Sequence, residues 1–259
     1  MDAASNDIFC GIMLARVWTM LAWQEIRQRY RRSVLGPFWL TISTAIMILG
    51  IGVIYGSIFG STRSKYLPYI AMSFVIWQLL AALLNEACQA FIVAEGYIKQ
   101  IKLPLSLHVL RVVWRNLIIF AHNLPIIVAA LFVSRPPLSW ELLEVPLGVL
   151  VLALNGVWAG LLLGMLCARF RDIPQIVASI VQLAFFVTPV MWEASMLKSH
   201  RWVLSVNPLY HFMETIRAPL LGSAPSSGSW LVVISITIVG SLITLLVFKR
   251  FRARIAYWL

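Results

Sequence analysis

Six long apolar segments, separated by short polar connections, dominate the hydrophobic pattern of this 259-residue chain. A helix needs about 20 apolar residues to cross the hydrocarbon core of a bilayer, and each segment is close to that length or exceeds it. Helices also satisfy their backbone hydrogen bonds internally, as lipid requires. The pattern therefore predicts an all-α integral membrane protein with six transmembrane helices, at Gly36–Phe59, Leu67–Cys88, Leu110–Val133, Val145–Ala168, Pro174–Met191 and Trp230–Phe248.

The first 35 residues have a different pattern, in which apolar and charged side chains are interspersed. Trp18 and Trp23 lie in the stretch Ile8–Leu35 together with Glu25 and several arginines. This mixture is typical of an amphipathic helix in the membrane interface, with its tryptophans at headgroup depth. We therefore expect residues 1–35 to form a cytoplasmic amphipathic interface helix and residues 36–259 to form one six-helix transmembrane domain.

Two connections between the predicted spans also carry structural signals. The loop Glu95–Leu103, between the second and third spans, is short and charged. The stretch Trp192–Gly222 is too apolar for a free loop, and Pro208 and Pro219 interrupt it. Irregular backbone at membrane depth must be buried in protein or face water. We predict that one or two short helices form a re-entrant outer segment between the fifth and sixth spans.

The basic residues are unevenly distributed around the spans, and this distribution predicts the orientation. Fifteen of the 21 Lys and Arg residues lie before the first span, after the sixth, or near the inner ends of the spans between them. Because cytoplasmic connections are enriched in Lys and Arg, both termini are expected in the cytoplasm, which agrees with an even number of spans. The outer group has six members: Arg63, Lys65, Arg135, Lys198, Arg201 and Arg217.

Composition supports a membrane protein and argues against nucleic acid as a partner. The chain is 61% hydrophobic and only 12% charged, whereas soluble domains carry about 25% charged residues. The net charge of +11 is better explained by contacts between helix ends and anionic lipid. We expect membrane lipids, and no nucleic acid, to contact this chain.

The cysteine and histidine residues, which often act as nucleophiles or metal ligands, occur singly along the chain. Cys10, Cys88 and Cys167 form no paired framework, and His122 and His211 have no acidic neighbours at metal-ligand spacing. No GxxxxGK[ST] motif occurs, and the chain contains no Gly-Lys dipeptide. We therefore expect no catalytic residues, no metal site and no bound cofactor, and we do not expect this chain to be an enzyme.

Glycines recur at every fourth residue in the first and fourth spans. This spacing places small residues on one helix face and lets helices approach closely in lipid. Packing inside one chain and a seam between two chains of a dimer both explain it. The glycines are Gly52, Gly56 and Gly60 in the first span and Gly156, Gly160 and Gly164 in the fourth.

Aromatic side chains near the outer ends of two spans are candidates for a substrate channel. Tyr55 and Phe59 are one turn apart in the first span, and Phe185 and Phe186 lie near the end of the fifth. Sugar rings stack their C–H faces on aromatic rings, so a glycan path would use such residues. Gln182 in the fifth span prefers a wet or protein-lined environment. Alternatively, the aromatic residues face lipid or belong to the interfacial belt.

Four short motifs occur in an order and at a spacing that resemble one known family. They are Arg29–Trp39 at the entry to the first span, Lys99–Pro104 after the second, Arg169–Ile173 before the fifth, and Asn207–His211 in the outer segment. With these motifs and its short basic tail, Arg254–Leu259, the chain resembles the permease subunits of type-2 ABC exporters for O-antigen, teichoic acid and capsule. The resemblance covers nearly the whole chain and is greatest to O-antigen permeases.

The resemblance implies a transport role in the bacterial inner membrane. It implies a homodimer that works with two copies of a separate ABC ATPase, on which ATP and Mg²⁺ would bind. It also implies export of a lipid-linked polysaccharide such as O-antigen, carried on undecaprenyl diphosphate, from cytoplasm to periplasm. Such a role would belong to lipopolysaccharide biosynthesis.

A chain driven by a separate ATPase needs a cytoplasmic coupling element that transmits the conformational change of the ATPase to the membrane helices. The loop Glu95–Leu103 is suitable because it is short and Pro104 sets a turn into the third span. The interface helix near Glu25 is the second candidate. Alternatively, these charges only hold helix ends to anionic lipid. The expected coupling residues are Glu95, Tyr97, Lys99, Lys102, Glu25 and Arg29.

A secondary transporter of a small solute or lipid is the alternative function. Proton or sodium coupling in such a protein usually requires carboxylates near the middle of the membrane. No Asp or Glu occurs in the middle of any predicted span. The sequence therefore favours the exporter over the secondary transporter, and a membrane enzyme is disfavoured by the missing acidic or histidine constellation.

The predicted orientation can be tested by single-cysteine labelling in a background that lacks the three native cysteines. Cysteines placed near Lys65, Ser139 and Ser199 are expected to react with an impermeant thiol reagent added from outside. Cysteines near Lys99 and at the C-terminus are expected to stay unlabelled, because basic connections face the cytoplasm. Labelling near Lys99 in intact spheroplasts would show that the orientation is wrong.

Overall fold

The computed structural model describes residues 3–60, 62–136, 140–197 and 199–259, and these ranges contain helices and no strand. The all-α prediction is therefore confirmed for the described part of the chain. Ser139 and Lys198, used above for orientation, lie outside the described residues.

The α-helices are α1 (Ala3–Met13), α2 (Ala15–Arg29), α3 (Phe38–Ile58), α4 (Arg63–Ala87), α5 (Glu95–Gln100), α6 (Leu105–Ser134), α7 (Glu144–Arg169), α8 (Ile173–Val187), α9 (Trp202–Val206), α10 (Pro208–Leu220), α11 (Ser227–Phe251) and α12 (Ile255–Trp258); the short 3₁₀ helices are η1 (Trp140–Leu143), η2 (Ala194–Met196) and η3 (Arg252–Arg254).

Five helices among the described residues are long and apolar enough to cross a membrane: α3, α4, α6, α7 and α11. They correspond to the predicted first, second, third, fourth and sixth spans. The predicted fifth span, Pro174–Met191, is the 15-residue helix α8, which ends at Val187. Thr188 has extended backbone geometry, because the following Pro189 disfavours the helical conformation for the residue before it. At about 1.5 Å per residue, α8 is shorter than a bilayer core.

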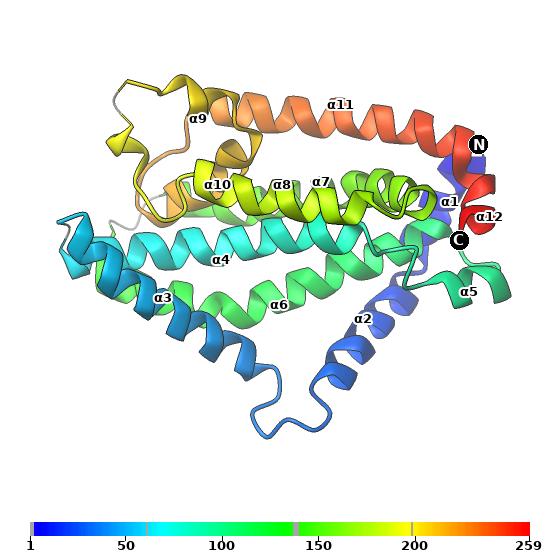
Figure 1. The fold of residues 1–259 in the computed structure, drawn as a ribbon, viewed down its shortest axis with the longest axis horizontal. Helices are drawn as coiled ribbons and strands as arrows, with labels where there is room; N and C mark the ends of the chain where they lie inside the picture. The colour runs from blue at the N-terminus through cyan, green and yellow to red at the C-terminus, as the bar shows by residue number, and fades with distance from the viewer. Residues whose placement is uncertain (1–2, 61, 137–139, 198) are drawn as a thin grey trace.

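The long helices lie side by side with α4 at the centre of the bundle (Figure 1). Helix α4 contacts α3, α6, α7, α8 and α10, and 72% of its apolar window is buried. Helix α3 is the opposite case, since only 17% of its window is buried and it diverges from the bundle. The two chain termini, α5 and α12 lie at one end of the bundle, which we call the proximal end, and the α3–α4 connection lies at the distal end.

The glycine faces pack inside this chain. A Cβ atom added to Gly160 would lie 2.5 Å from Val109 Cγ1 of α6, and one added to Gly164 would lie 3.0 Å from the ring of Phe91. In α3, a Cβ on Gly52 would lie 2.5 Å from Leu67 Cδ1 of α4. These distances confirm packing within the bundle as a reason for the glycines.

The N-terminal segment differs from the single interface helix that the sequence predicted. It forms two helices, α1 and α2, that are interrupted at Leu14, where the backbone leaves helical geometry. Helix α1 packs on α6 and α11, and α2 packs on α6. Helix α2 ends at Arg29, not at Leu35, and the chain then turns into α3 through Gly36, which has a left-handed φ of 56°.

Candidate functional site

Helix α5, at the proximal end, is the most exposed of the predicted coupling elements. Lys99 Nζ donates to Glu95 Oε1 at 2.6 Å, and this pairing lowers the pKa of the Glu95 carboxyl below its usual value. Such i,i+4 pairs stabilise helices on the surface. The Tyr97 side chain is 53% exposed, and Lys102 is exposed just after the helix. Four of the six expected coupling residues are thus together on one accessible segment beyond the bundle (Figure 1).

The other two expected coupling residues lie on α2, and they differ from each other. Arg29 is exposed at the end of the helix. Glu25 is paired inside the chain, with Arg111 at 2.9 Å and with Arg115. The Glu25 carboxylate therefore ties α2 to α6 and is not available as a free contact for a partner.

Glu86 completes this group of charges and connects it to α4. Arg115 Nη2 donates to Glu86 Oε2 at 2.7 Å, and Asn116 Nδ2 donates to the same oxygen at 2.7 Å. The Glu86 carboxylate is therefore paired with an arginine and an amide. We call Glu25, Arg111, Arg115 and Glu86 the proximal ion network, because it joins α2, α4 and α6 where basic side chains enter the predicted third span.

Asp7 forms a second junction at the proximal end that sequence reasoning missed. Its fully buried carboxylate accepts hydrogen bonds from the backbone amides of Leu105 (3.1 Å) and Ser106 (3.0 Å), the first residues of α6. It also accepts from Arg252 Nε at 2.7 Å. Negative charge is favourable at a helix N-terminus, where amides are unpaired. Asp7 thus joins α1, the start of α6 and the end of α11 next to the point where α5 leads into α6.

The expected channel residues separate into half-buried and exposed groups. Tyr55 and Phe59 have ring centroids 5.9 Å apart, and Phe59 is 5.9 Å from Tyr66 of α4. Phe185 packs 5.6 Å from Trp77 and 6.3 Å from Phe74, also on α4. The aromatic residues of α3 and α8 therefore form two separate clusters, each packed against α4.

Gln182 and Phe186 belong to an exposed stripe along α8, and the Phe186 ring also lies 5.4 Å from the ring of Phe185. Gln175, Ser179, Gln182 and Phe186 follow one another at spacings of four, three and four residues, and all are exposed. The side-chain amides of Gln175 and Gln182 would be unfavourable if they faced lipid, because polar groups lose their hydrogen bonds to water there. This stripe is typical of a face that meets water or another protein surface.

At the distal end, the turn after α8 is held by side chains from α4. The Tyr69 hydroxyl lies 2.9 Å from the carbonyl oxygen of Pro189 and 2.8 Å from that of Trp192. Tyr66 Oη donates to the Met191 carbonyl. These bonds satisfy carbonyl groups of irregular backbone that has no helical partner, as buried backbone requires.

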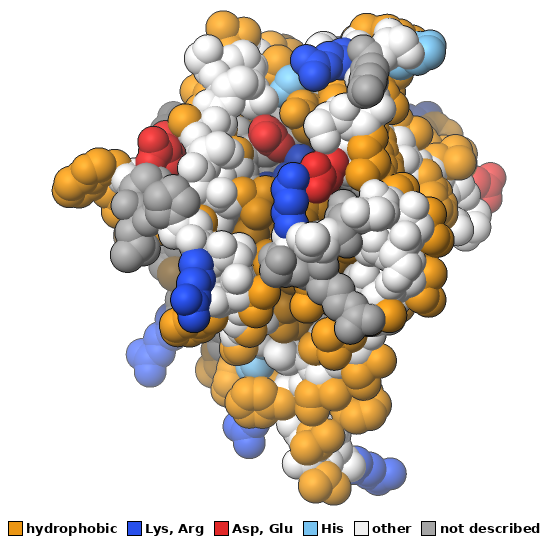
Figure 2. Space-filling view, turned by 90° about the vertical axis from the view of Figure 1, so that its left-hand side faces the viewer, with side chains coloured by type: hydrophobic (Ala, Val, Ile, Leu, Met, Phe, Trp, Pro, Cys, Tyr) orange, Lys and Arg blue, Asp and Glu red, His pale blue; other side chains and the backbone are white. Residues whose placement is uncertain are grey.

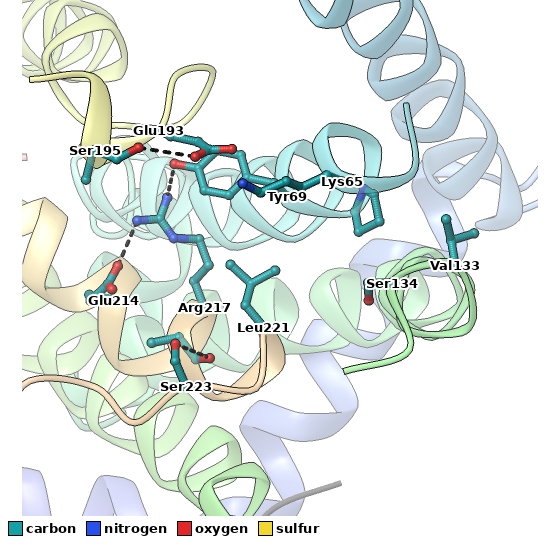
Figure 3. Close-up of a pocket in the computed structure, with 13 residues that line it drawn as sticks. Lys65, Tyr69, Val133, Ser134, Glu193, Ser195, Glu214, Arg217, Leu221 and Ser223 are labelled. Carbon is teal, nitrogen blue, oxygen red and sulfur yellow. Dashed lines mark hydrogen bonds and ion pairs between the residues drawn. The ribbon is translucent and has the colours of Figure 1, made fainter. Parts of the chain in front are cut away.

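Arg217 of α10 is the buried cation of the same turn and is only 3% exposed. Its guanidinium donates to the Pro189 carbonyl, to Tyr69 Oη at 2.9 Å and to Ser73 Oγ at 3.2 Å. It also pairs with Glu214 at 2.7 Å (Figure 3). Sequence reasoning counted Arg217 only as an outer basic residue, and the available signal was its place in an apolar stretch three residues after Glu214.

Two kinds of comparison place this chain among known proteins. Residues 16–221 match the family described as ABC-2 type transporter. Two proteins named O-antigen export system permease protein RfbA, from Klebsiella pneumoniae, are 25% and 24% identical over 189 residues, which are 72% of this chain and 73% of each relative. A protein of the same name from Myxococcus xanthus is 22% identical over 202 residues, 76% of this chain and 77% of the relative.

Replacement of Arg217 tests whether it holds the distal turn. Arg217→Met is expected to lower the thermal midpoint of the detergent-solubilised chain, since it removes four donated bonds and leaves Glu214 without its cation. Breaking a buried ion pair costs about 3–5 kcal/mol. Arg217→Lys is expected to have an intermediate midpoint, and the exposed Arg201→Met serves as the control. A wild-type midpoint for Arg217→Met would contradict this role.

Proposed function

Because this chain belongs to the ABC-2 type transporter family, we propose that it is the membrane-spanning subunit of an ATP-driven polysaccharide exporter. The substrate is a polysaccharide linked to undecaprenyl diphosphate, such as O-antigen, which moves from cytoplasm to periplasm. The observation that carries this proposal is similarity to O-antigen export permeases over 72–77% of both chains. ATP and Mg²⁺ bind to a separate ABC ATPase, and this chain contains no P-loop motif of its own.

The proposed topology has six crossings in the bacterial inner membrane, with the proximal end in the cytoplasm. Helix α8 begins at the proximal end and ends at the distal end, and both termini lie at the proximal end (Figure 1). An odd number of crossings would leave the termini on opposite sides. The arrangement supports α8, extended by the Thr188–Trp192 turn, as the fifth crossing, and the distal helices α9 and α10 as the re-entrant segment.

The proposed assembly is a homodimer with two ATPase subunits. Helix α3 exposes an apolar face that includes Ile46, Met47 and Ile54. The exposed polar stripe of α8, which contains Gln182 and Phe186, suits a water-filled path that a second copy of the chain would close. Both features support assembly around α3 and α8.

Helix α5 is the proposed contact for the ATPase. It is exposed at the proximal end and leads through Pro104 into α6, whose first turn is bound to α1 and α11 through Asp7. A displacement of α5 would therefore act on three helices. The proximal ion network, which includes Glu25, holds α2 against α6 next to this contact.

Reconstitution tests the proposed function against a secondary transporter. The chain and its ATPase, placed together in liposomes with lipid-linked polysaccharide, are expected to translocate the polymer when ATP is hydrolysed. An ion gradient without ATP is expected to have no effect. Gradient-driven transport of a small solute without the ATPase would contradict the proposal.

Charge reversal on α5 tests the proposed ATPase contact. Lys99→Glu with Lys102→Glu, and separately Glu95→Lys, are expected to weaken ATPase association and to reduce export roughly tenfold, because complementary charges steer and hold such contacts. The swap Glu95→Lys with Lys99→Glu keeps an ion pair within α5 and so separates helix stability from partner recognition. Full association and export in all three variants would show that α5 is not the coupling element.

Paired substitutions separate channel residues from packing residues. Gln182→Leu with Phe186→Ala is expected to reduce export while lowering the thermal midpoint less than the substitutions below, because both side chains are exposed and Phe186 loses only its packing on Phe185, at 5.4 Å. Tyr55→Ala with Phe59→Ala, and Phe185→Ala alone, are expected to lower the midpoint, since aromatic pairs contribute about 0.5–1.5 kcal/mol beyond their burial. Wild-type export by Gln182→Leu with Phe186→Ala would remove the α8 stripe from the substrate path.

A further inference from the structure

A cavity of about 560 Å³ opens among four elements at the distal end. Its walls come from the start of α4, the end of α6, η2 and α10, together with Ser223 (Figure 3). Sites for small molecules usually have volumes of about 300–1,000 Å³. Figure 2 looks onto this end, where acidic and basic side chains lie next to one another on a surface that is otherwise largely uncharged.

One side of the cavity is polar and contains groups of both charge signs. Lys65, Glu193 and Glu214 line it, with the hydroxyl group of Ser195, whereas Ser134 lies beside Val133 on α6 (Figure 3). One oxygen of Glu214 accepts from Arg217, and one oxygen of Glu193 accepts from Ser195 Oγ at 3.2 Å. A carboxylate offers about four acceptor positions, so both groups keep capacity for a ligand. The cavity can thus donate and accept hydrogen bonds.

The other side of the cavity is apolar and is built by side chains that cannot form hydrogen bonds. Pro68, Val133 and Leu221 line it. A pyranose ring has the matching two-sided chemistry, because its C–H groups are apolar and its hydroxyl groups both donate and accept. Ligand sites commonly combine such an apolar wall with a few placed polar groups.

The charges of the cavity argue against an ionic ligand. Two cations, Lys65 and Arg217, balance two carboxylates, Glu193 and Glu214. A phosphate or a uronic acid would approach both carboxylates, and a divalent cation would approach both basic groups. The described residues also contain no group of three or more His, Cys, Asp or Glu side chains that could hold a metal ion. An uncharged ligand avoids all of these repulsions.

We infer that this cavity binds an uncharged sugar residue, which, if the proposed function holds, belongs to the polysaccharide as it leaves the distal end. Glu193 and Lys65 bind its hydroxyl groups, and the apolar wall contacts its ring. Arg217 holds Glu214 at the base of the cavity and the Pro189 carbonyl of the turn after α8. The sugar site and the end of α8 therefore share one buried side chain.

Binding to the full chain in nanodiscs tests the inference directly. The probe is a mixture of short oligosaccharides cut from the surface polysaccharide of the producing cells, and binding is followed by ligand-observed NMR. Lys65→Met and Glu193→Gln are each expected to weaken binding at least roughly tenfold, because each removes a hydrogen bond to a charged group. Arg201→Met, exposed and outside the cavity lining, is the matched control and is expected to bind as the wild type does.

Each outcome of the binding experiment has a defined meaning. No binding, or equal binding by all variants, would overturn the sugar site. Inorganic phosphate or Ca²⁺ bound by the wild type and lost in Lys65→Met or Glu193→Gln would also overturn it, because the cavity would then be an ion site. Export is measured separately in the reconstituted complex. Export without oligosaccharide binding contradicts this inference alone, whereas oligosaccharide binding without export contradicts the proposed function alone.

Thiol protection in cells gives a second readout. In a background without the native cysteines, Ser195→Cys at the cavity is expected to react more slowly with an impermeant maleimide while polymer is synthesised than when synthesis is blocked. Ser227→Cys, exposed at the start of α11 and outside the cavity lining, is expected to react equally in both conditions. Equal reactivity of Ser195→Cys in both conditions would overturn occupation of the cavity during export.

Discussion

Buried backbone that leaves helical geometry must find its hydrogen-bond partners within the protein, and the distal half of this molecule is organised around that requirement. Helix α8 ends before Pro189, and the turn that follows exposes carbonyl groups. Tyr66 and Tyr69 of α4 and Arg217 of α10 bind these groups. These bonds join α4, α10 and the turn, and they form the base of the distal cavity.

The proximal half depends on a comparable balance of charge. Arg111 and Arg115 would be costly in an apolar helix without partners, and Glu25 and Glu86 provide those partners from two other helices. The Asp7 carboxylate accepts hydrogen bonds from the first backbone amides of α6, which have no partner within the helix. The charged residues of the proximal ion network and Asp7 therefore connect helices to one another. Helix α5, with its exposed pair Glu95 and Lys99, lies next to these connections.

Much of the fold could be predicted from the sequence, because an apolar run of sufficient length specifies a helix in lipid. The predicted spans match α3, α4, α7 and α11 to within a few residues. The third span was predicted to begin at Leu110, whereas α6 begins at Leu105. Distant partners could not be predicted: Glu25 meets arginines 86 and 90 residues away, and one sequence holds no record of such pairs. For the same reason, Tyr55, Phe59 and Phe185 were predicted to line one channel, whereas they pack against α4 in two separate clusters.

The uneven burial of the helices has a mechanical consequence. Helices α4, α6 and α7 are closely packed through glycines, so relative displacement within this trio would create voids or overlaps. Helix α3 contacts its own chain on one side only, where it packs against α4 and α6. It follows Gly36, whose backbone is left-handed. Helix α3 also packs on α4 through Gly52, but only 17% of its apolar window is buried, so a tilt of α3 would disturb fewer contacts than a rearrangement of α4. The molecule is in this sense a bundle built around the buried helix α4, with α3 along its edge.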